Sequence, residues 1–122
     1  MNFKATVLHK IGLPLTVEDV QLTELKQGDV LVRLYASGLC HTDLEVIEGS
    51  LPYPLPITLG HEGAGVVEEV GAGVRKVVPG DPVVMTFDSC GACPSCRDAQ
   101  PSYCHNSNPF VSSRPESEYY LK

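Results

Sequence analysis

The chain has 122 residues, the common size of one domain around a single hydrophobic core, and its content of 43% hydrophobic and 20% charged residues excludes disorder along the whole length. Its net charge of -6 comes from 15 acidic and 9 basic residues without a lysine or arginine cluster, which argues against nucleic acid or an anionic membrane surface as partner. Since no apolar run approaches the roughly 18 residues of a membrane span and the N-terminus lacks a secretory signal, we expect a cytoplasmic protein whose partner is a small neutral molecule.

Five short segments alternate apolar and polar positions, as strands with one buried face do. In chain order they are residues 4–9, 15–20, 29–36, 65–70 and 82–87, each bounded by glycine or proline. The third segment shows the pattern most plainly and predicts a core-facing row of Val30, Val32, Leu34 and Ala36. The fold class is therefore predicted to be mainly β.

One short helix is predicted from Thr42 to Glu48. Thr42 and Glu45 have the spacing of a capping box, and Gly49 lies where a helix would end. From His105 onward the sequence is polar and rich in serine and proline, so residues 105–122 are predicted to be a linker or a ragged end.

Two glycine-rich stretches raise the question of a dinucleotide site. Neither Gly63-Ala64-Gly65 nor Gly71-Ala72-Gly73 completes G-x-G-x-x-G, and no helix pattern follows either of them. No Rossmann unit is predicted, so a nucleotide-binding domain is absent from these residues.

Four of the five cysteines are crowded into one segment, with the spacing C-x2-C-x2-C-x7-C. They are Cys90, Cys93, Cys96 and Cys104, and we call residues 90–104 the zinc lobe. Four thiolates around zinc make a closed tetrahedral site, which stabilises structure and has no open position for a substrate. The alternatives are an iron-sulfur cluster and free thiols, but ferredoxin spacing brings the fourth cysteine sooner and places proline after it.

The fifth cysteine belongs to a second group of possible ligands. Cys40 begins the sequence Cys40-His41-Thr42-Asp43, and Gly60-His61-Glu62 follows twenty residues later. A catalytic zinc takes three protein ligands and keeps one open position, so Cys40 and His61 make only part of a site. A purely structural interpretation is also open, with Cys40 a small buried residue, His61 a hydrogen-bonded core histidine and Thr42 a helix cap.

The complete pattern resembles a known family. Gly60-His61-Glu62, then Gly65, Gly71 and Val74 at their spacings, is similar to the signature of zinc-containing alcohol dehydrogenases of the medium-chain dehydrogenase/reductase family. The similarity extends from about Lys4 to Cys104 and is greatest to the aryl (benzyl-type) branch. It implies a GroES-like, partly open β barrel with a short helix and a zinc-binding loop, over residues 1–104.

The resemblance also implies roles for single residues. Cys40 and His61 would bind a catalytic zinc, with Glu62 a close acidic neighbour, and Asp43 would hydrogen-bond the ligand imidazole. Thr42 would pass the alcohol proton toward the nicotinamide ribose, and His41 would meet the pyrophosphate of the cofactor. The implied reaction is hydride transfer from an alcohol to NAD(P), which yields an aldehyde.

Two departures from the family pattern qualify this prediction. Glu45 occupies the position where some members carry a histidine that releases the relayed proton. The third ligand of the catalytic zinc and the nucleotide-binding domain would lie beyond Lys122. We therefore expect an incomplete domain that is inactive alone. For the full-length protein we expect a homo-oligomer. The alternative function is a non-enzymatic structural zinc-binding module.

Overall fold

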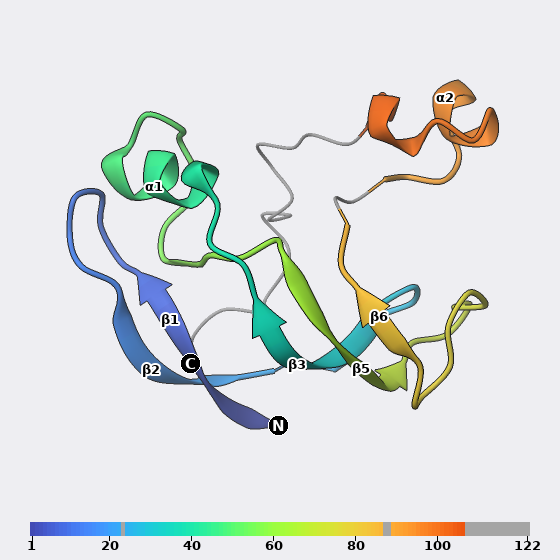
Figure 1. The fold of residues 1–122 in the computed structure, drawn as a ribbon, viewed down its shortest axis with the longest axis horizontal. Coiled ribbons are helices and arrows are strands. Elements are labelled where there is room, and N and C mark those ends of the chain that lie inside the picture. The colour runs from blue at the N-terminus through green and yellow to red at the C-terminus, as the bar shows by residue number, and fades with distance from the viewer. Residues whose placement is uncertain (23, 87–88, 107–122) are drawn as a thin grey trace.

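Two three-stranded antiparallel sheets form the body of the chain, in the strand orders β2-β1-β4 and β3-β5-β6 (Figure 1). The computed structural model describes residues 1–22, 24–86 and 89–106. The strands are β1 (Asn2–Leu8), β2 (Thr16–Gln21), β3 (Val30–Ser37), β4 (Ile57–Thr58), β5 (Gly63–Val70) and β6 (Pro82–Val84). The helices are α1 (His41–Glu48), α2 (Pro94–Arg97) and the 3-10 turn η1 (Pro101–Tyr103). The predicted mainly β fold is confirmed.

The five predicted strands are all present, each displaced by a few residues at its ends, and Phe87 of the last prediction lies outside the described residues. Helix α1 is also present and ends at Gly49, whose φ of 83° gives the predicted left-handed cap. Strand β4 was not predicted, because two residues are too few to show an alternation. Nearly all of the predicted linker, residues 107–122, lies outside the described residues.

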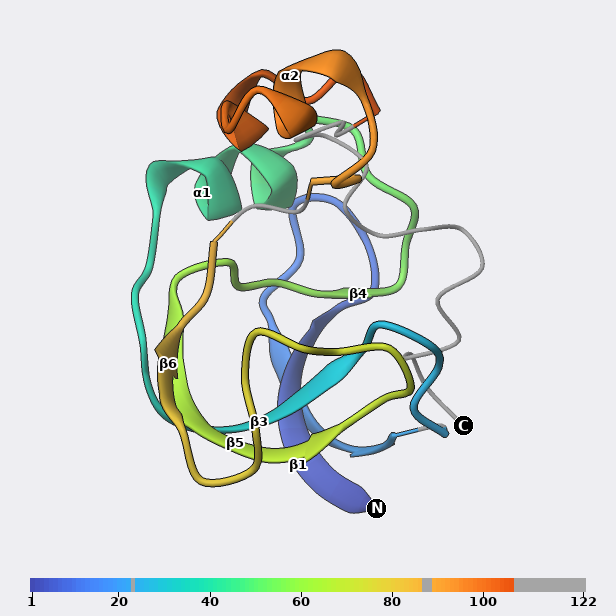
Figure 2. The same ribbon diagram turned by 90° about the vertical axis from the view of Figure 1, so that its right-hand side faces the viewer.

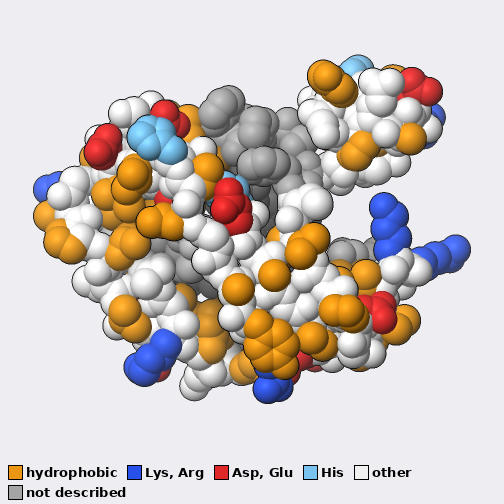
Figure 3. Space-filling model, in the orientation of Figure 1, with side chains coloured by type: hydrophobic (Ala, Val, Ile, Leu, Met, Phe, Trp, Pro, Cys, Tyr) orange, Lys and Arg blue, Asp and Glu red, His pale blue; other side chains and the backbone are white. Residues whose placement is uncertain are grey.

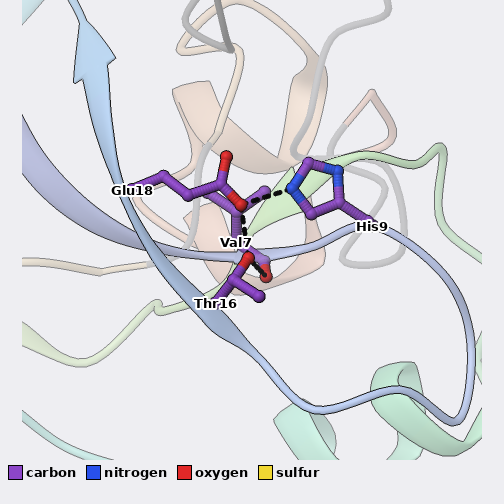
Figure 4. A network of polar contacts seen from close by, with 4 residues as sticks. All are labelled: Val7, His9, Thr16 and Glu18. Atoms are coloured by element: carbon purple, nitrogen blue, oxygen red, sulfur yellow. Dashed lines mark hydrogen bonds and ion pairs between the residues drawn. The ribbon is translucent and has the colours of Figure 1, made fainter.

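A small polar network holds the β1–β2 hairpin together at its turn end, where the connecting loop begins (Figure 4). The Nε2 atom of His9 donates a hydrogen bond of 2.5 Å to Glu18, and the Thr16 hydroxyl donates to the same carboxylate oxygen. These two hydrogen bonds lower the pKa of Glu18, because both stabilise its negative charge, and the bond from Thr16 has the larger effect. The network joins the two strands where their ladder ends at Val7 and Thr16.

The buried core lies between the β1–β4 sheet and helix α1. Leu8, Val46 and Ile57 form one buried cluster, and partly buried side chains such as Leu15, Leu51 and Leu59 pack against it. Val46 is on the inner face of α1, so this cluster fixes the helix against the sheet.

The predicted core face of β3 is not buried in the described part of the chain. Leu34 is 52% exposed, and its cross-strand neighbour on β5 is Gly65, which carries no side chain to cover it. A hollow of about 210 Å3, lined by Phe3, Leu34, Leu59 and Met85 among others, separates the two sheets at this point. Two β-bulges, between Leu31 and Val32 and between Leu34 and Ala36, also break the predicted row, so its four side chains do not share one face. The prediction of a single core-facing row was therefore wrong, because a strict alternation assumes a regular ladder. Figure 2 shows the two sheets curling around this interior.

Hydrophobic side chains also gather over the β3-β5-β6 sheet on the face drawn in Figure 3. Tyr35, 75% exposed, lies in the irregular stretch of β3 between Leu34 and Ala36, and Val84 of the edge strand is 76% exposed.

A membrane-spanning helix is not found in the part of the chain that the structure describes, where every helix is too short or too polar for one.

Two valines of the β1–β2 hairpin test where the core lies. Val7 is 1% exposed and Val17 is 67% exposed. We expect Val7→Ala to lower the free energy of unfolding by about 2 kcal/mol, from lost burial and the cavity left behind. Val17→Ala, the same change on the exposed face, should alter it by less than about 0.5 kcal/mol. Urea unfolding measures both, and equal losses would contradict this assignment of the core.

Candidate metal and catalytic site

The end of the β3–β5 ladder brings the two halves of the second ligand group together. Ser37 pairs with Gly63 in the last rung, and the backbone N–H of Gly38 donates to the carbonyl of Glu62 over 2.9 Å. Cys40 follows two residues after Gly38, and His61 precedes Glu62. Antiparallel pairing therefore places neighbouring ends of two distant segments side by side.

Helix α1 begins immediately after Cys40. The N-cap is Cys40, and the carboxylate of Asp43 accepts a hydrogen bond of 3.0 Å from its backbone N–H. The capping box thus joins Cys40 and Asp43, and the prediction that Thr42 and Glu45 form it was wrong. The sequence favoured threonine because its hydroxyl is a common cap, whereas the aspartate at the third helical position here supplies the reciprocal bond. His41, Thr42 and Asp43 lie in the first turn of α1, which begins one residue before the predicted start at Thr42.

Asp43 links the helix to His61. The residue is buried, at 4% exposure, and its second carboxylate oxygen lies 3.6 Å from Nδ1 of His61. The other ring nitrogen, Nε2, lies 3.9 Å from a carboxylate oxygen of Glu62. One side of the imidazole therefore faces a fixed negative charge, and the opposite side faces the remaining possible ligands.

Cys40, His61 and Glu62 form a group that could hold a metal ion, which we call the Cys40–His61 site. One ligand atom from each residue lies within 4.8 Å of the other two. The thiol of Cys40 is 3.5 Å from the Thr42 hydroxyl, so a hydroxyl that can exchange a proton lies next to this group of ligands. Sulfur, imidazole nitrogen and carboxylate oxygen are all ligands that zinc accepts. The residues present fit such an ion.

The zinc lobe gathers all four predicted cysteines. Their sulfur atoms lie within 4.8 Å of one another, with 4.0 Å between Cys90 and Cys96 and 4.0 Å between Cys93 and Cys104. Around one tetrahedral ion, metal–sulfur distances of about 2.3 Å place the sulfurs about 3.8 Å apart. The lobe therefore fits one ion better than a multi-iron cluster, whose thiolates bind different iron atoms.

Local turns and amide donors organise the lobe. Helix α2 begins with Pro94 after Cys93, and backbone N–H groups of Ala92 and Cys93 point to the Cys90 sulfur at 3.4 and 3.3 Å. Asn106 donates a side-chain hydrogen bond to the same sulfur, and the backbone N–H of His105 lies 3.5 Å from the Cys93 sulfur. Sequence reasoning missed Asn106, because nothing in the cysteine spacing points to a donor beyond the last ligand.

The thiols of the lobe differ in acidity. Hydrogen bonds from the Ala92 N–H, the Asn106 amide and the Cys93 N–H lower the pKa of Cys90 to about 6. Partial burial and the neighbouring thiols of Cys93 and Cys104 raise the pKa of Cys96 to about 12. A hydrogen bond from the backbone N–H of His105 lowers the pKa of Cys93 as well. The lobe thus favours negative charge on some sulfurs and opposes it on Cys96, and a divalent cation would favour the thiolate form of all four.

Comparison with known proteins agrees with this geometry. The family model described as the alcohol dehydrogenase GroES-like domain matches residues 26–114. The chain therefore belongs to the alcohol dehydrogenase GroES-like domain family.

Individual relatives point the same way. The chain is 52% identical over 104 residues to geraniol dehydrogenase from Castellaniella defragrans, covering 85% of this chain and 28% of that protein. An alcohol dehydrogenase zinc-binding domain protein from Burkholderia ambifaria is similar in structure, with a TM-score of 0.80, 46% identity, and coverage of 84% of this chain and 28% of that one. Benzyl alcohol dehydrogenase from Acinetobacter calcoaceticus gives a TM-score of 0.82 at 36% identity, over 86% and 29%. The chain thus spans less than a third of the length of each.

Removing single cysteines should separate the two metal sites. We expect one zinc per chain to survive dialysis, and Cys96→Ser to abolish it and lower the melting temperature more than Cys40→Ser does. Only the first variant removes a ligand from a site that organises its own loop, where metal binding energy is folding energy. Elemental analysis and thermal unfolding measure both effects. A brown protein that contains iron, or equal thermal losses, would contradict the expectation.

Asp43 both accepts the Cys40 N–H and places a charge beside His61, and two substitutions can separate these roles. Asp43→Asn retains an oxygen that can accept the Cys40 N–H, so it should cost less stability than Asp43→Ala, which removes this bond of the capping box and should cost about 1 kcal/mol. Both variants remove the charge beside His61 and should weaken zinc binding at the Cys40–His61 site by about 10-fold. Urea unfolding and zinc titration read the two effects separately. Zinc affinity unchanged in Asp43→Asn would show that the charge has no part in holding His61.

Proposed function

We propose that residues 1–104 supply the zinc-binding and proton-handling part of an alcohol dehydrogenase that oxidises an alcohol to an aldehyde with NAD(P). The observation that supports this best is the convergence of Cys40, His61 and Glu62, with Asp43 behind the imidazole. The family membership and the names of the relatives agree with it.

In this proposal each residue of the Cys40–His61 site has a separate task. A bound zinc would act as a Lewis acid that makes an alcohol hydroxyl more acidic. Cys40 and His61 would hold the ion, and among the described residues Glu62 would offer the third donor atom, a carboxylate oxygen. Asp43, with a carboxylate oxygen 3.6 Å from Nδ1 of His61, would favour the protonated form of that nitrogen and so leave Nε2 as the ligand atom.

Proton and cofactor handling fall to the first turn of α1. The Thr42 hydroxyl oxygen, 3.5 Å from the Cys40 sulfur, would accept the proton that leaves the alcohol. The side chain of His41 is exposed next to it and would contact the pyrophosphate of the cofactor. Glu45, where some relatives of this kind have histidine, would not continue a histidine relay.

The remaining predictions belong to the same proposal. The zinc lobe would hold its ion for structural purposes, since four cysteines leave no open position. The substrate would be a small apolar primary alcohol, as the names geraniol dehydrogenase and benzyl alcohol dehydrogenase of two similar proteins suggest. A cytoplasmic location and a homo-oligomer remain predictions from the sequence.

A non-enzymatic zinc-binding module is the second candidate. It would need the zinc lobe, whose ligands all lie within one short segment, but it has no use for a second group of ligands. The two functions differ in whether the residues around Cys40 matter for anything beyond folding.

A chimera provides the decisive test. Residues 1–104 of this chain would replace the corresponding residues of the geraniol dehydrogenase from Castellaniella defragrans, to which this chain is 52% identical over an alignment of 104 residues. We expect the chimera to form NADH with geraniol, and Thr42→Ala to reduce the rate by about 100-fold or more because proton transfer is lost. Residues 1–122 alone should form none.

The control is Thr16→Ala, which removes a threonine hydroxyl from the distant β1–β2 hairpin and should leave the rate of the chimera unchanged. A folded chimera that holds zinc but never forms NADH would favour the structural module. An active chimera indifferent to Thr42→Ala would limit Thr42 to a structural role.

A further inference from the structure

The space beside Gly38 determines where the carboxylate of Glu62 lies. A β-carbon built on Gly38 would be 2.2 Å from Oε2 of Glu62, 3.1 Å from its Cβ and 3.3 Å from its Cδ. The first distance is far shorter than any non-bonded contact allows. The side chain of Glu62 therefore occupies the volume that a side chain at position 38 would fill.

Backbone conformation does not explain a glycine at this position. Gly38 is absent from the glycines with positive φ, so its backbone lies in a region open to other residues. It continues the register of β3 and β5, in which Ser37 pairs with Gly63, and it donates to the carbonyl of Glu62. Residues opposite each other in such a ladder project their side chains to the same face. The steric conflict is thus with Glu62 itself.

The position of the carboxylate matters for the Cys40–His61 site. One oxygen of Glu62 rests over Gly38, and the other lies 3.9 Å from Nε2 of His61. The carboxylate therefore lies between the imidazole and the space that Gly38, without a side chain, leaves free. Displaced from Gly38, it would rotate toward solvent, since the Glu62 side chain is already 49% exposed.

We propose that Gly38 is a positioning residue, whose lack of a side chain lets Glu62 reach the Cys40–His61 site as the third metal donor. This inference rests on the proposed function, because it assumes that the site holds zinc. Gly38→Ala should move the carboxylate away without unfolding the chain, since the atom in severe conflict is the end of a flexible side chain.

The test uses the 122-residue chain with zinc as the probe. The chain is first loaded with one equivalent of zinc for the zinc lobe, and a second equivalent is then titrated while NMR follows the ring resonances of His61. We expect Gly38→Ala to weaken binding of the second zinc about 10- to 100-fold, as loss of a supporting group at a metal site does. Glu62→Ala should produce a similar loss.

The double variant distinguishes positioning from a general disturbance of the ladder. If Gly38 acts through Glu62, adding Gly38→Ala to Glu62→Ala should weaken zinc binding no further. A further loss in the double variant would mean that residue 38 acts by another route, for instance through Cys40, and would overturn the proposal. Unchanged zinc affinity in the single variant Gly38→Ala would overturn it as well.

A measurement without the second zinc completes the test. In the wild-type chain, nuclear Overhauser contacts are expected between the Hα protons of Gly38 and the Hγ protons of Glu62, and their absence would overturn the proposal. A wild-type chain that never binds a second zinc at His61 would contradict the proposed function and, with it, the donor role of Glu62. A wild-type site that binds zinc and ignores Gly38→Ala contradicts only the role of Gly38.

Discussion

The antiparallel register of β3 and β5 is the constraint on which the rest of the Cys40–His61 site depends. With Ser37 opposite Gly63, the next positions along the two chains become neighbours, and the N–H of Gly38 bonds the carbonyl of Glu62. A shift of one residue would turn every side chain to the opposite face and separate Cys40 from His61. Helix α1 adds the second restraint, because its capping aspartate also faces the imidazole.

The positions of the helix and strands could be predicted well from the sequence, but the burial of their faces could not. The five strands and helix α1 come from local alternation and cap residues, which act over a few neighbours. Strand β4 has two residues and exists only because it pairs with Val7 and Leu8. Likewise, the apolar row of β3 was expected to be buried, but bulges interrupt the row, and Gly65 opposite Leu34 provides no side chain to cover it.

The candidate site divides in the same way between local and non-local information. The spacing of the four lobe cysteines was sufficient to predict that they converge, since their turns are local. The pairing of Cys40 with His61 came from resemblance to a family, because no residue-level rule connects segments twenty residues apart. Gly38 could not be predicted from either source. Its importance appears only when the side-chain direction of Glu62 is known.

The two candidate metal sites should therefore respond differently to the stability of the sheets. The zinc lobe takes all its ligands from one segment with its own turns and amide donors, so its ion can organise the loop independently of β3 and β5. The Cys40–His61 site takes its ligands from both ends of the β3–β5 ladder, so an ion there binds the paired strands and not the separated ones. Binding to the folded form alone stabilises that form in proportion to the logarithm of ligand concentration over Kd. An ion at this site would therefore strengthen the ladder that creates it, and a weakened ladder would lower the affinity of this site before that of the lobe.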